Sequence, residues 1–385
     1  MIKVCVVTGT RAEYGLLRST LHRIKASSIL DLQLVVTGTH LSPEFGLTYT
    51  EIVEDGFLID QKIEMLLSSD SSVGMTKSTG LALCGFADAF NTLSPDLILL
   101  LGDRYEIFAA ATAAMLARIP IAHIHGGEKT AGAIDDSIRH SITKMSHVHF
   151  VATEEYRSRV LQLGEQPEQI HVVGGLAAEN INQQTLLSRD ELEQQLDFSF
   201  GKHNLLVTFH PATLSRGVAK QQMSELLDAL KSLENTKIIF TMPNADSESR
   251  ELSVMINAFI QANSATVSGF TSLGQRRYLS CIQYVDAVVG NSSSGLLEAP
   301  SFQKGTINIG ERQAGRAKAS SVIDCQPIKA SITEAFQILY SSRFQQQLLS
   351  TINPYDKGAA SEKIVAQLES LDYANLLKKE FLDQF

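Results

Sequence analysis

The sequence is short of the features that mark disulfide-bonded, membrane and nucleic-acid-binding proteins. Its four cysteines in 385 residues lie far apart and form no C-x-x-C pair, which excludes a disulfide framework and favours a reducing compartment. No apolar run approaches the roughly 18 residues that a membrane span needs. The first residues, MIKVCVVTGT, lack the layout of a signal peptide. The net charge of −9 argues against a nucleic-acid partner. We therefore expect a cytoplasmic protein with no membrane partner.

Two common nucleotide-binding motifs are missing as well. The first glycine turn, Thr8-Gly9-Thr10-Arg11, is not G-x-G-x-x-G, and no acidic residue closes the following strand, which disfavours a nicotinamide cofactor. The second glycine turn begins at Gly290 and is not followed by Gly-Lys-Ser/Thr, which excludes a P-loop. The clustered His, Asp and Glu residues match no zinc spacing. The sequence therefore predicts neither a cofactor nor a metal.

Short apolar runs alternate with helical stretches along the whole chain, which is typical of βαβ units and parallel sheets. The length favours two domains. We expect an α/β protein with two Rossmann-like domains, the first over 1–175 and the second over 176–360. Periodicity alone does not assign the helical segment 361–385 to either domain, and the polar stretch Leu67–Gly80 is predicted to be a mobile loop or lid. The expected strands are Lys3–Thr8, Leu32–Val36, Leu97–Leu101, Ile119–His125, Val148–Ala152 and His171–Val173, then Leu205–Thr208, Lys237–Thr241, Ala287–Gly290 and Thr306–Ile309.

Ionisable residues follow two of the apolar runs in the first half. Leu97–Leu101 is followed by Asp103 and Arg104, and the next run is followed by His125 and Glu128, with Asp135 soon after. Ligands of open α/β sheets bind beyond the carboxyl ends of the strands. Crowded carboxyl groups shift one another's pKa, so the same residue type can supply both an acid and a base. The sequence therefore predicts acid–base chemistry at this edge of the sheet.

Donors suited to an anion follow other strands. Backbone N–H groups and Arg11 at the first turn favour a phosphate, as do Ser292 and Ser293, which we expect to cap a helix and face a diphosphate. Glu298, about two turns further on, suits the two hydroxyls of a ribose. His210 follows a strand and is a candidate to bind phosphate or donate a proton. Ordinary helix caps and a core histidine are the alternatives. Asn244 and Arg312 follow strands in equivalent positions.

The chain resembles the hydrolysing UDP-N-acetylglucosamine 2-epimerases over essentially its whole length. The resemblance implies a two-domain fold like that of glycosyltransferase-B enzymes, a UDP-sugar bound in the interdomain cleft, a C-terminal helix that returns to the first domain, and a homodimer or homotetramer. It rests on TGTRAEYG (8–15), LVVTGTHLSPEFG (34–46), LGDRYEIF (101–108), HIHGGE (123–128), DDSIRHSITKMSH (135–147), GNSSSGLLEA (290–299), INIGERQAGR (307–316) and NPYDKGAASEKI (353–364).

The resemblance also implies roles for individual residues. The family's acid–base candidates fall on Asp103 and Asp135. Many relatives carry Glu where this chain has His125, so either His125 or Glu128 takes that part of the proton work. The nucleotide-binding candidates are Arg11, Arg104, His210, Asn244, Ser292, Ser293, Glu298 and Arg312.

The implied reaction removes the proton at carbon 2 of the sugar while UDP leaves carbon 1, and water then adds to the 2-acetamidoglycal to give free N-acetylmannosamine. The same chemistry on UDP-2,4-diacetamido-2,4,6-trideoxyglucose, in the legionaminic acid pathway, is the alternative. A non-hydrolysing epimerase is disfavoured by HIHGGE. A catalytically silent UDP-sugar-binding protein is disfavoured because Asp103, Glu128 and Asp135 are intact. A glycosyltransferase is an option on fold alone.

Overall fold

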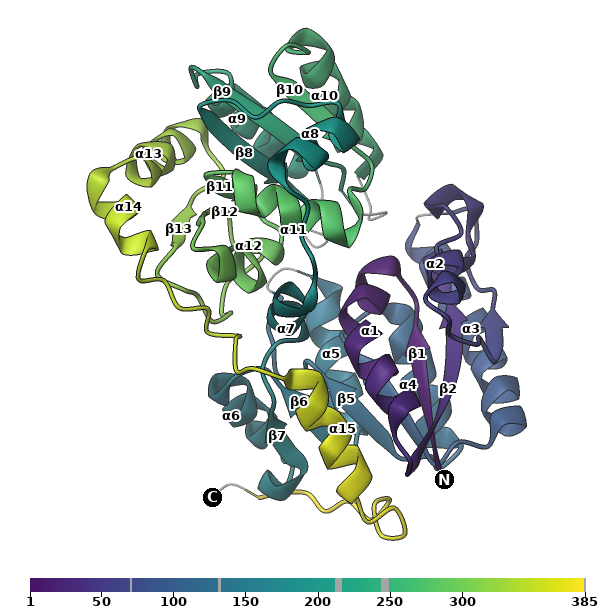
Figure 1. Cartoon of the computed structure of the whole chain (residues 1–385). Helices are drawn as coiled ribbons and strands as arrows, with labels where there is room; N and C mark the ends of the chain where they lie inside the picture. The colour runs from purple at the N-terminus through teal and green to yellow at the C-terminus, as the bar shows by residue number, and fades with distance from the viewer. Residues whose placement is uncertain (70, 131–132, 212–216, 244–248, 384–385) are drawn as a thin grey trace. The chain divides into compact units, whose positions relative to one another are not determined.

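Figure 1 shows the chain in a computed structural model, which describes residues 1–69, 71–130, 133–211, 217–243 and 249–383. The chain folds into two compact units. The first comprises Met1–Glu128, Asp135–Asn180 and Lys357–Phe385, and the second Lys129–Ile134 and Ile181–Asp356. The chain passes from the first unit to the second after Asn180 and returns at Lys357, a few residues from the expected boundaries at 175/176 and 360/361. The sequence analysis did not anticipate that Lys129–Ile134 belongs to the second unit.

The first unit contains a seven-stranded sheet in which all neighbouring strands are parallel. The strand order is β3-β2-β1-β4-β5-β6-β7. The strands are β1 (Ile2–Thr8), β2 (Leu30–Thr37), β3 (Gln61–Ile63), β4 (Leu97–Leu101), β5 (Ile121–Ile124), β6 (Val148–Val151) and β7 (Ile170–Val172). The helices are α1 (Arg11–Ala26), α2 (Tyr49–Glu54), α3 (Ser72–Leu93), α4 (Tyr105–Leu116), α5 (Ile134–Met145), α6 (Glu154–Gln162), α7 (Leu176–Gln183) and α15 (Ala360–Ser370), with 3-10 turns η1 (Gly38–Leu41), η2 (Pro43–Phe45) and η3 (Pro167–Gln169).

Helices cover both faces of this sheet, which explains why its strands are continuous apolar runs. Successive side chains of a strand point to opposite faces. Val4 and Val6 accordingly pack with α1 and α15, whereas Cys5 and Val7 pack with α3 and α4. The unit therefore has three layers with a hydrophobic core on each side of the sheet (Figure 1).

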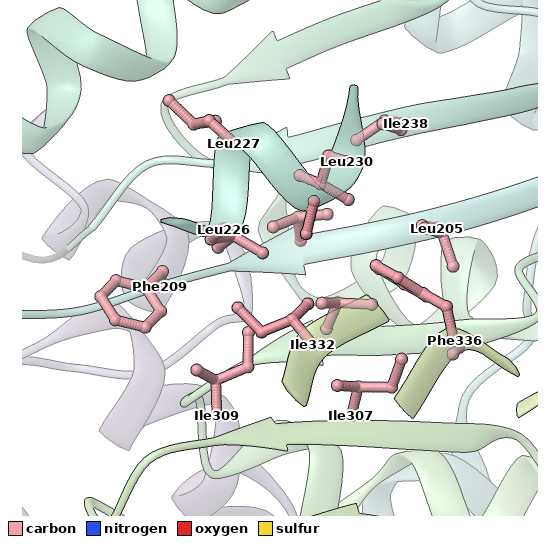
Figure 2. Close-up of a cluster of buried hydrophobic side chains, with 14 of the residues drawn as sticks. Leu205, Phe209, Leu226, Leu227, Leu230, Ile238, Ile307, Ile309, Ile332 and Phe336 are labelled. Atoms are coloured by element: carbon pink, nitrogen blue, oxygen red, sulfur yellow. The ribbon is translucent and has the colours of Figure 1, made fainter. Parts of the chain in front are cut away.

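The second unit repeats this plan with a six-stranded parallel sheet in the order β10-β9-β8-β11-β12-β13. Figure 2 shows the core on one face, where Leu205 and Ile307 of the sheet meet Leu226 and Phe336 of the helices. The strands are β8 (His203–Thr208), β9 (Thr236–Thr241), β10 (Val267–Phe270), β11 (Ala287–Gly290), β12 (Gly305–Ile309) and β13 (Val322–Cys325). The helices are α8 (Arg189–Leu196), α9 (Ala219–Leu230), α10 (Ser249–Ala262), α11 (Gly274–Tyr284), α12 (Ser294–Leu297), α13 (Lys329–Leu339) and α14 (Ser342–Leu348), with η4 (Ala299–Phe302).

The predicted α/β class with parallel sheets in two Rossmann-like units is confirmed. The ten predicted strands all exist, with ends shifted by one or two residues. The sequence analysis missed β3, β10 and β13, and each of these is an edge strand. An edge strand is exposed on one side, so it carries polar residues such as Lys62 or Asp324 and shows no continuous apolar run.

The prediction of a mobile loop or lid over Leu67–Gly80 is wrong from Ser72 onward, where α3 begins. Ser71 caps this helix, because its Oγ accepts the Gly74 N–H at 3.0 Å. The helix buries Gly74, Ser78 and Ala82 on one face, four residues apart. These side chains are too small or too polar to mark a buried face in the sequence.

The segment 361–385 is helical only in part, since α15 ends at Ser370. α15 packs against α1 in the first unit (Figure 1). Residues 371–383 run over the same unit, where Leu382 N–H donates to Gly164 O at 2.9 Å and Lys379 Nζ donates to Ser146 O at 2.6 Å. Among the helices that the structure describes, none combines the length and the apolar character that crossing a bilayer requires.

Candidate active site

The chain order reverses at one place in each sheet. In the first unit β1 lies between β2 and β4, and in the second β8 lies between β9 and β11. Parallel α/β sheets bind their ligands beyond the carboxyl ends of the strands at such a reversal. Most predicted site residues follow these strands, Arg11, Asp103 and Arg104 in the first unit and His210 and Ser292 in the second, and His125 and Arg312 follow the adjacent strands β5 and β12. Each unit thus carries a candidate half-site at the reversal point of its sheet.

The acidic residues of the first half-site surround Arg139, which the sequence analysis had not named as a site residue. Arg139 lies on α5, is 3% exposed, and forms an ion pair with Asp103. Its Nη1 donates to the backbone oxygen of His125 at 3.0 Å and lies 3.8 Å from Glu128 Oε2. Burial alone would lower the pKa of this guanidinium, but the negative charges of Asp103, Glu128, Asp135 and Asp136 raise it. The structure therefore brings the predicted acids together around one cation.

His125 enters this cluster through an unusual backbone conformation. Its φ of +67° lies in the left-handed region, which a non-glycine residue seldom adopts. The two glycines that follow allow the tight turn, since a Cβ on Gly127 would lie 2.5 Å from Tyr156 O. The turn sets His125 Nδ1 3.5 Å from Glu128 Oε1. Strain of this kind is retained mainly where function requires it.

The members of the cluster differ in their access to solvent. The Glu128 side chain is 2% exposed and that of His125 is 9% exposed, whereas that of Asp103 is 21% exposed. Asp135 is half-buried in the first turn of α5. A group that takes a proton from a substrate must reach it, so Asp103 and Asp135 are better placed for this than Glu128.

His123 holds in place the end of β4 that precedes Asp103, a role that the sequence analysis had not suggested. Its Nε2 lies 2.7 Å from Gly102 O and its Nδ1 lies 3.2 Å from Thr143 Oγ1, so it joins the end of β4 to α5. Burial lowers the pKa of His123 to about 3, against the opposing effect of the bond to Gly102. The ring is therefore a neutral spacer and not a cation.

The two arginines predicted to bind an anion both have carboxylate partners in the first unit. Arg11 begins α1 and donates from Nε and Nη2 to the two oxygens of Glu51, at 3.0 and 2.8 Å. Arg104 Nε donates to Glu106 Oε1 at 2.6 Å. A diphosphate would have to compete with these carboxylates or add to them.

In the second half-site, His210 and Asn291 are joined by two hydrogen bonds. His210 N–H donates to Asn291 Oδ1 at 2.7 Å, and Asn291 Nδ2 donates to His210 O at 2.8 Å. Arg312 Nη1 and Gln313 Nε2 both donate to Asn291 O, at 3.1 and 2.8 Å. The ends of β8, β11 and β12 are therefore held by one asparagine that the sequence analysis had not singled out.

Burial, with the charge of Arg312 as the second cause, lowers the pKa of His210 to about 3. The imidazole is neutral at physiological pH in the absence of a ligand. In that state it can donate one hydrogen bond to a phosphate, but it adds no positive charge.

The serine-rich turn differs in part from its predicted form. α12 is a single turn that ends at Leu297, so Glu298 directly follows it instead of lying two turns in. Ser293 makes no side-chain capping bond, although Ser292 Oγ accepts the Ser294 N–H at 3.4 Å. Ser294 Oγ donates to Glu298 Oε2 at 2.5 Å. Burial raises the pKa of Glu298 to about 6 in spite of this bond. Asn244 lies outside the described residues.

A family model described as UDP-N-acetylglucosamine 2-epimerase matches residues 22–369. The chain belongs to the UDP-N-acetylglucosamine 2-epimerase family. A Campylobacter jejuni protein named "GDP/UDP-N,N'-diacetylbacillosamine 2-epimerase (hydrolyzing)" is 43% identical to it, over 99% of each chain. The "Polysialic acid biosynthesis protein P7" of Escherichia coli is 38% identical, over 100% of this chain and 97% of its own.

A solved family structure has the same fold. The UDP-GlcNAc 2-epimerase of Neisseria meningitidis, bound to UDP-GlcNAc, aligns with a TM-score of 0.81 at 18% identity, over 95% of this chain and 99% of its own. At this identity the likeness shows the fold of the family and not the residues of its site.

The sequence held one signal that would have extended the candidate list. Thr10 and Glu13 fit the S/T-x-x-E pattern of a capping box, and the structure contains that box at the start of α1. No comparable local pattern marks Arg139, Glu106 or Asn291, because each is defined by partners on other strands or helices.

Proposed function

We propose that the chain is a hydrolysing 2-epimerase of nucleotide-linked 2-acetamido sugars. The reaction consumes the nucleotide sugar and water and releases the nucleoside diphosphate and the free sugar inverted at carbon 2. One observation supports it above the others: Asp103 after β4, His125 and Glu128 after β5, and Asp135 on α5 gather around the buried Arg139.

The arrangement suggests how the steps are divided. Asp103 or Asp135 takes the proton from carbon 2 as the carbon–oxygen bond at carbon 1 breaks, and the electron pair of the C–H bond forms the double bond of the glycal. Water then adds across this bond, with its hydroxyl at carbon 1 and a proton returned to the opposite face of carbon 2. Arg139 fixes the acids in place. The candidate donors to the leaving diphosphate are Arg104 in the first unit and Arg312 and His210 in the second.

We propose N,N'-diacetylbacillosamine, linked to UDP, as the first candidate sugar. This assignment rests on the relative at 43% identity, whose name gives that sugar with either GDP or UDP. N-acetylglucosamine is the second candidate. It is favoured by the relative at 38% identity, since a protein of polysialic acid biosynthesis fits the supply of N-acetylmannosamine.

Incubation of the full chain with UDP-diacetylbacillosamine, GDP-diacetylbacillosamine and UDP-GlcNAc, followed in deuterated water, tests the proposal. We expect nucleoside diphosphate release with one deuterium at carbon 2 of a free, epimerised sugar, and the fastest release identifies the substrate. An epimer still linked to the nucleotide would contradict hydrolysis. UDP binding without turnover of any sugar would show a binding protein instead, and Asp103→Asn provides the inactive control.

A further inference from the structure

Two buried glutamates lie beneath the turn that follows β1, outside the acidic cluster around Arg139. Glu13 is 7% exposed, and its Oε2 accepts the N–H groups of Gly9 and Thr10 at 2.8 and 3.2 Å. Thr10 Oγ1 accepts the Glu13 N–H in return at 3.2 Å, which completes a capping box. The carboxyl group of Glu13 is thus fixed at the N-terminus of α1.

Glu106 reaches the same turn from α4 and is 1% exposed. Its Oε1 accepts from Arg104 Nε at 2.6 Å. A Cβ on Gly9 would lie 2.5 Å from Glu106 Cγ, so this side chain packs directly against Gly9. Both carboxyl groups therefore contact Gly9, one through its N–H and one against its Cα.

Both the charges and the hydrogen bonds of Glu13 and Glu106 favour a proton on one of the two carboxyl groups. Glu13 and Glu106 carry two acidic groups, while Arg104 supplies one positive charge. Glu13 Oε1 and Glu106 Oε2 are buried and accept no hydrogen bond from the described residues. A buried carboxylate oxygen without a donor costs far more free energy than a buried protonated carboxyl group. Burial, and then the negative charge of Glu106, raise the pKa of Glu13 to about 8, against the opposing effects of Arg104 and of the Gly9 N–H.

We propose that Glu13 and Glu106 are a positioning pair in which Glu13 holds a proton, and that this proton keeps Arg104 and the first turn able to bind the diphosphate of the substrate. This inference rests on the proposed function, because it takes a nucleoside diphosphate as the ligand. With the proton, Glu13, Glu106 and Arg104 have no net charge. Without it they carry one negative charge, which repels an anion at the N-terminus of α1.

The charged groups around the pair support this assignment. Glu13 faces Glu106, Arg104 and Asp103. The negative charges of Glu106 and Asp103 therefore oppose the ionisation of Glu13. From η1, His40 hydrogen-bonds to Thr8 at 3.1 Å, and burial lowers its pKa to about 4. The neutral imidazole adds no compensating charge. A proton on the pair is therefore the source of neutrality at this turn.

The second unit contains a control for the helix-capping function of Glu13. α8 begins with a capping box formed by Ser188 and Glu191, and Glu191 is exposed to solvent. Hydrogen bonds from Ser188 lower the pKa of Glu191. The same motif thus holds an ionised glutamate at α8 and a protonated one at α1, and the difference is burial beside Glu106.

UDP affinity of the full chain, measured by calorimetry from about pH 6 to about pH 9, tests the pair. For the wild type we expect affinity to fall by up to about tenfold between pH 7 and pH 9, as the proton is lost. Glu13→Gln mimics the protonated acid, so its affinity should stay level. Glu106→Gln removes the neighbouring negative charge, which should move the fall to lower pH. Glu191→Gln should match the wild type.

Infrared spectra of the ligand-free protein at neutral pH provide a test that does not need UDP. We expect a protonated carboxyl band in the wild type and in Glu191→Gln that is absent from Glu13→Gln. Absence of this band from the wild type, or equal pH profiles for the wild type and Glu13→Gln with UDP bound, would overturn the proton on Glu13. A wild type that shows the band but binds no UDP at any pH would overturn the positioning role and the proposed function while leaving the proton in place.

Discussion

The guanidinium of Arg139 is almost wholly buried, yet its ion-pair partner Asp103 keeps a fifth of its side chain exposed, at 3% against 21%. The pair therefore has a fixed end and an accessible end. Asp103 follows β4 and Arg139 lies on α5, so the contact also ties two elements of the half-site together. This geometry suits a base that must be oriented without being enclosed.

Replacement of Asp103 by Asn should lower turnover by about 100-fold or more, the usual contribution of acid–base catalysis. The amide keeps the size of the side chain but removes the negative charge opposite Arg139, so we expect a folded protein with a lower melting temperature and with UDP affinity close to that of the wild type. Steady-state kinetics with the preferred nucleotide sugar, together with UDP calorimetry, measure these effects. Unchanged turnover would remove Asp103 from the proton chemistry and leave Asp135 as the candidate.

Replacement of Arg139 by Met should destabilise the protein by about 3–5 kcal/mol, because Glu128 then stays buried beside no cation. Urea unfolding of the full chain measures this loss of unfolding free energy. Arg343 is an exposed arginine on α14, and Arg343→Met should change stability by no more than about 0.5 kcal/mol. If both variants unfold alike, Arg139 does not hold the acidic cluster together.

The sequence predicted the fold class and ten strands, because nine of these are central strands covered on both faces; the tenth, β7, is an edge strand. An apolar run bounded by glycine, such as Leu97–Leu101, specifies a central strand without any information from elsewhere. The edge strands β3, β10 and β13, and helix α3, escaped prediction for the opposite reason. Their burial is one-sided or falls on small residues such as Gly74 and Ser78.

The sequence predicted only those site residues that directly follow a strand, and not the partners that they contact. Asp103 and His125 stand out because charge follows an apolar run, but the choice of their partner Arg139 depends on how α5 packs on the sheet. The pairing of Arg11 with Glu51 joins residues 40 positions apart. The φ of +67° at His125 was likewise not predictable, since only a small minority of histidines adopt a positive φ and nothing local in the sequence marks this one.

Replacement of Gly290 by Ala should disrupt the second half-site, since a Cβ there would lie 1.9 Å from Thr208 O. Both β8 and β11 would have to move apart, and we expect a loss of more than about 4 kcal/mol in unfolding free energy, with no UDP binding. Gly46→Ala is the matched control. Gly46 also has a positive φ, but a Cβ would meet nothing within 4 Å, so only the backbone strain of about 1–2 kcal/mol applies. Similar losses in both variants would show that strain, and not the contact with Thr208, sets the requirement at Gly290.

The C-terminal segment is tied to the first unit through Glu165. This carboxylate accepts from Lys144 Nζ at 2.6 Å and from His149 Nε2 at 2.9 Å, and Lys379 Nζ of the C-terminal segment lies 2.7 Å from it. Burial would raise the pKa of Glu165, but the bonds from His149, Lys144 and Lys379 outweigh it and lower the pKa to about 2. The ionised form is therefore the one that the fold stabilises.

A carboxyl group whose folded pKa is lowered stabilises the fold above its unfolded pKa, and this stability is lost as the pH falls through the folded value. We expect Glu165→Gln to be less stable than its parent at neutral pH, with a gap that narrows as the pH falls below about 4.5. Both proteins should carry His149→Gln, because burial also lowers the pKa of His149 and its titration would otherwise overlap. Urea unfolding at stepped pH measures the gap. A gap that stays constant or widens below pH 4.5 would mean that the ion pairs of Glu165 with Lys144 and Lys379 do not hold the C-terminal segment in place.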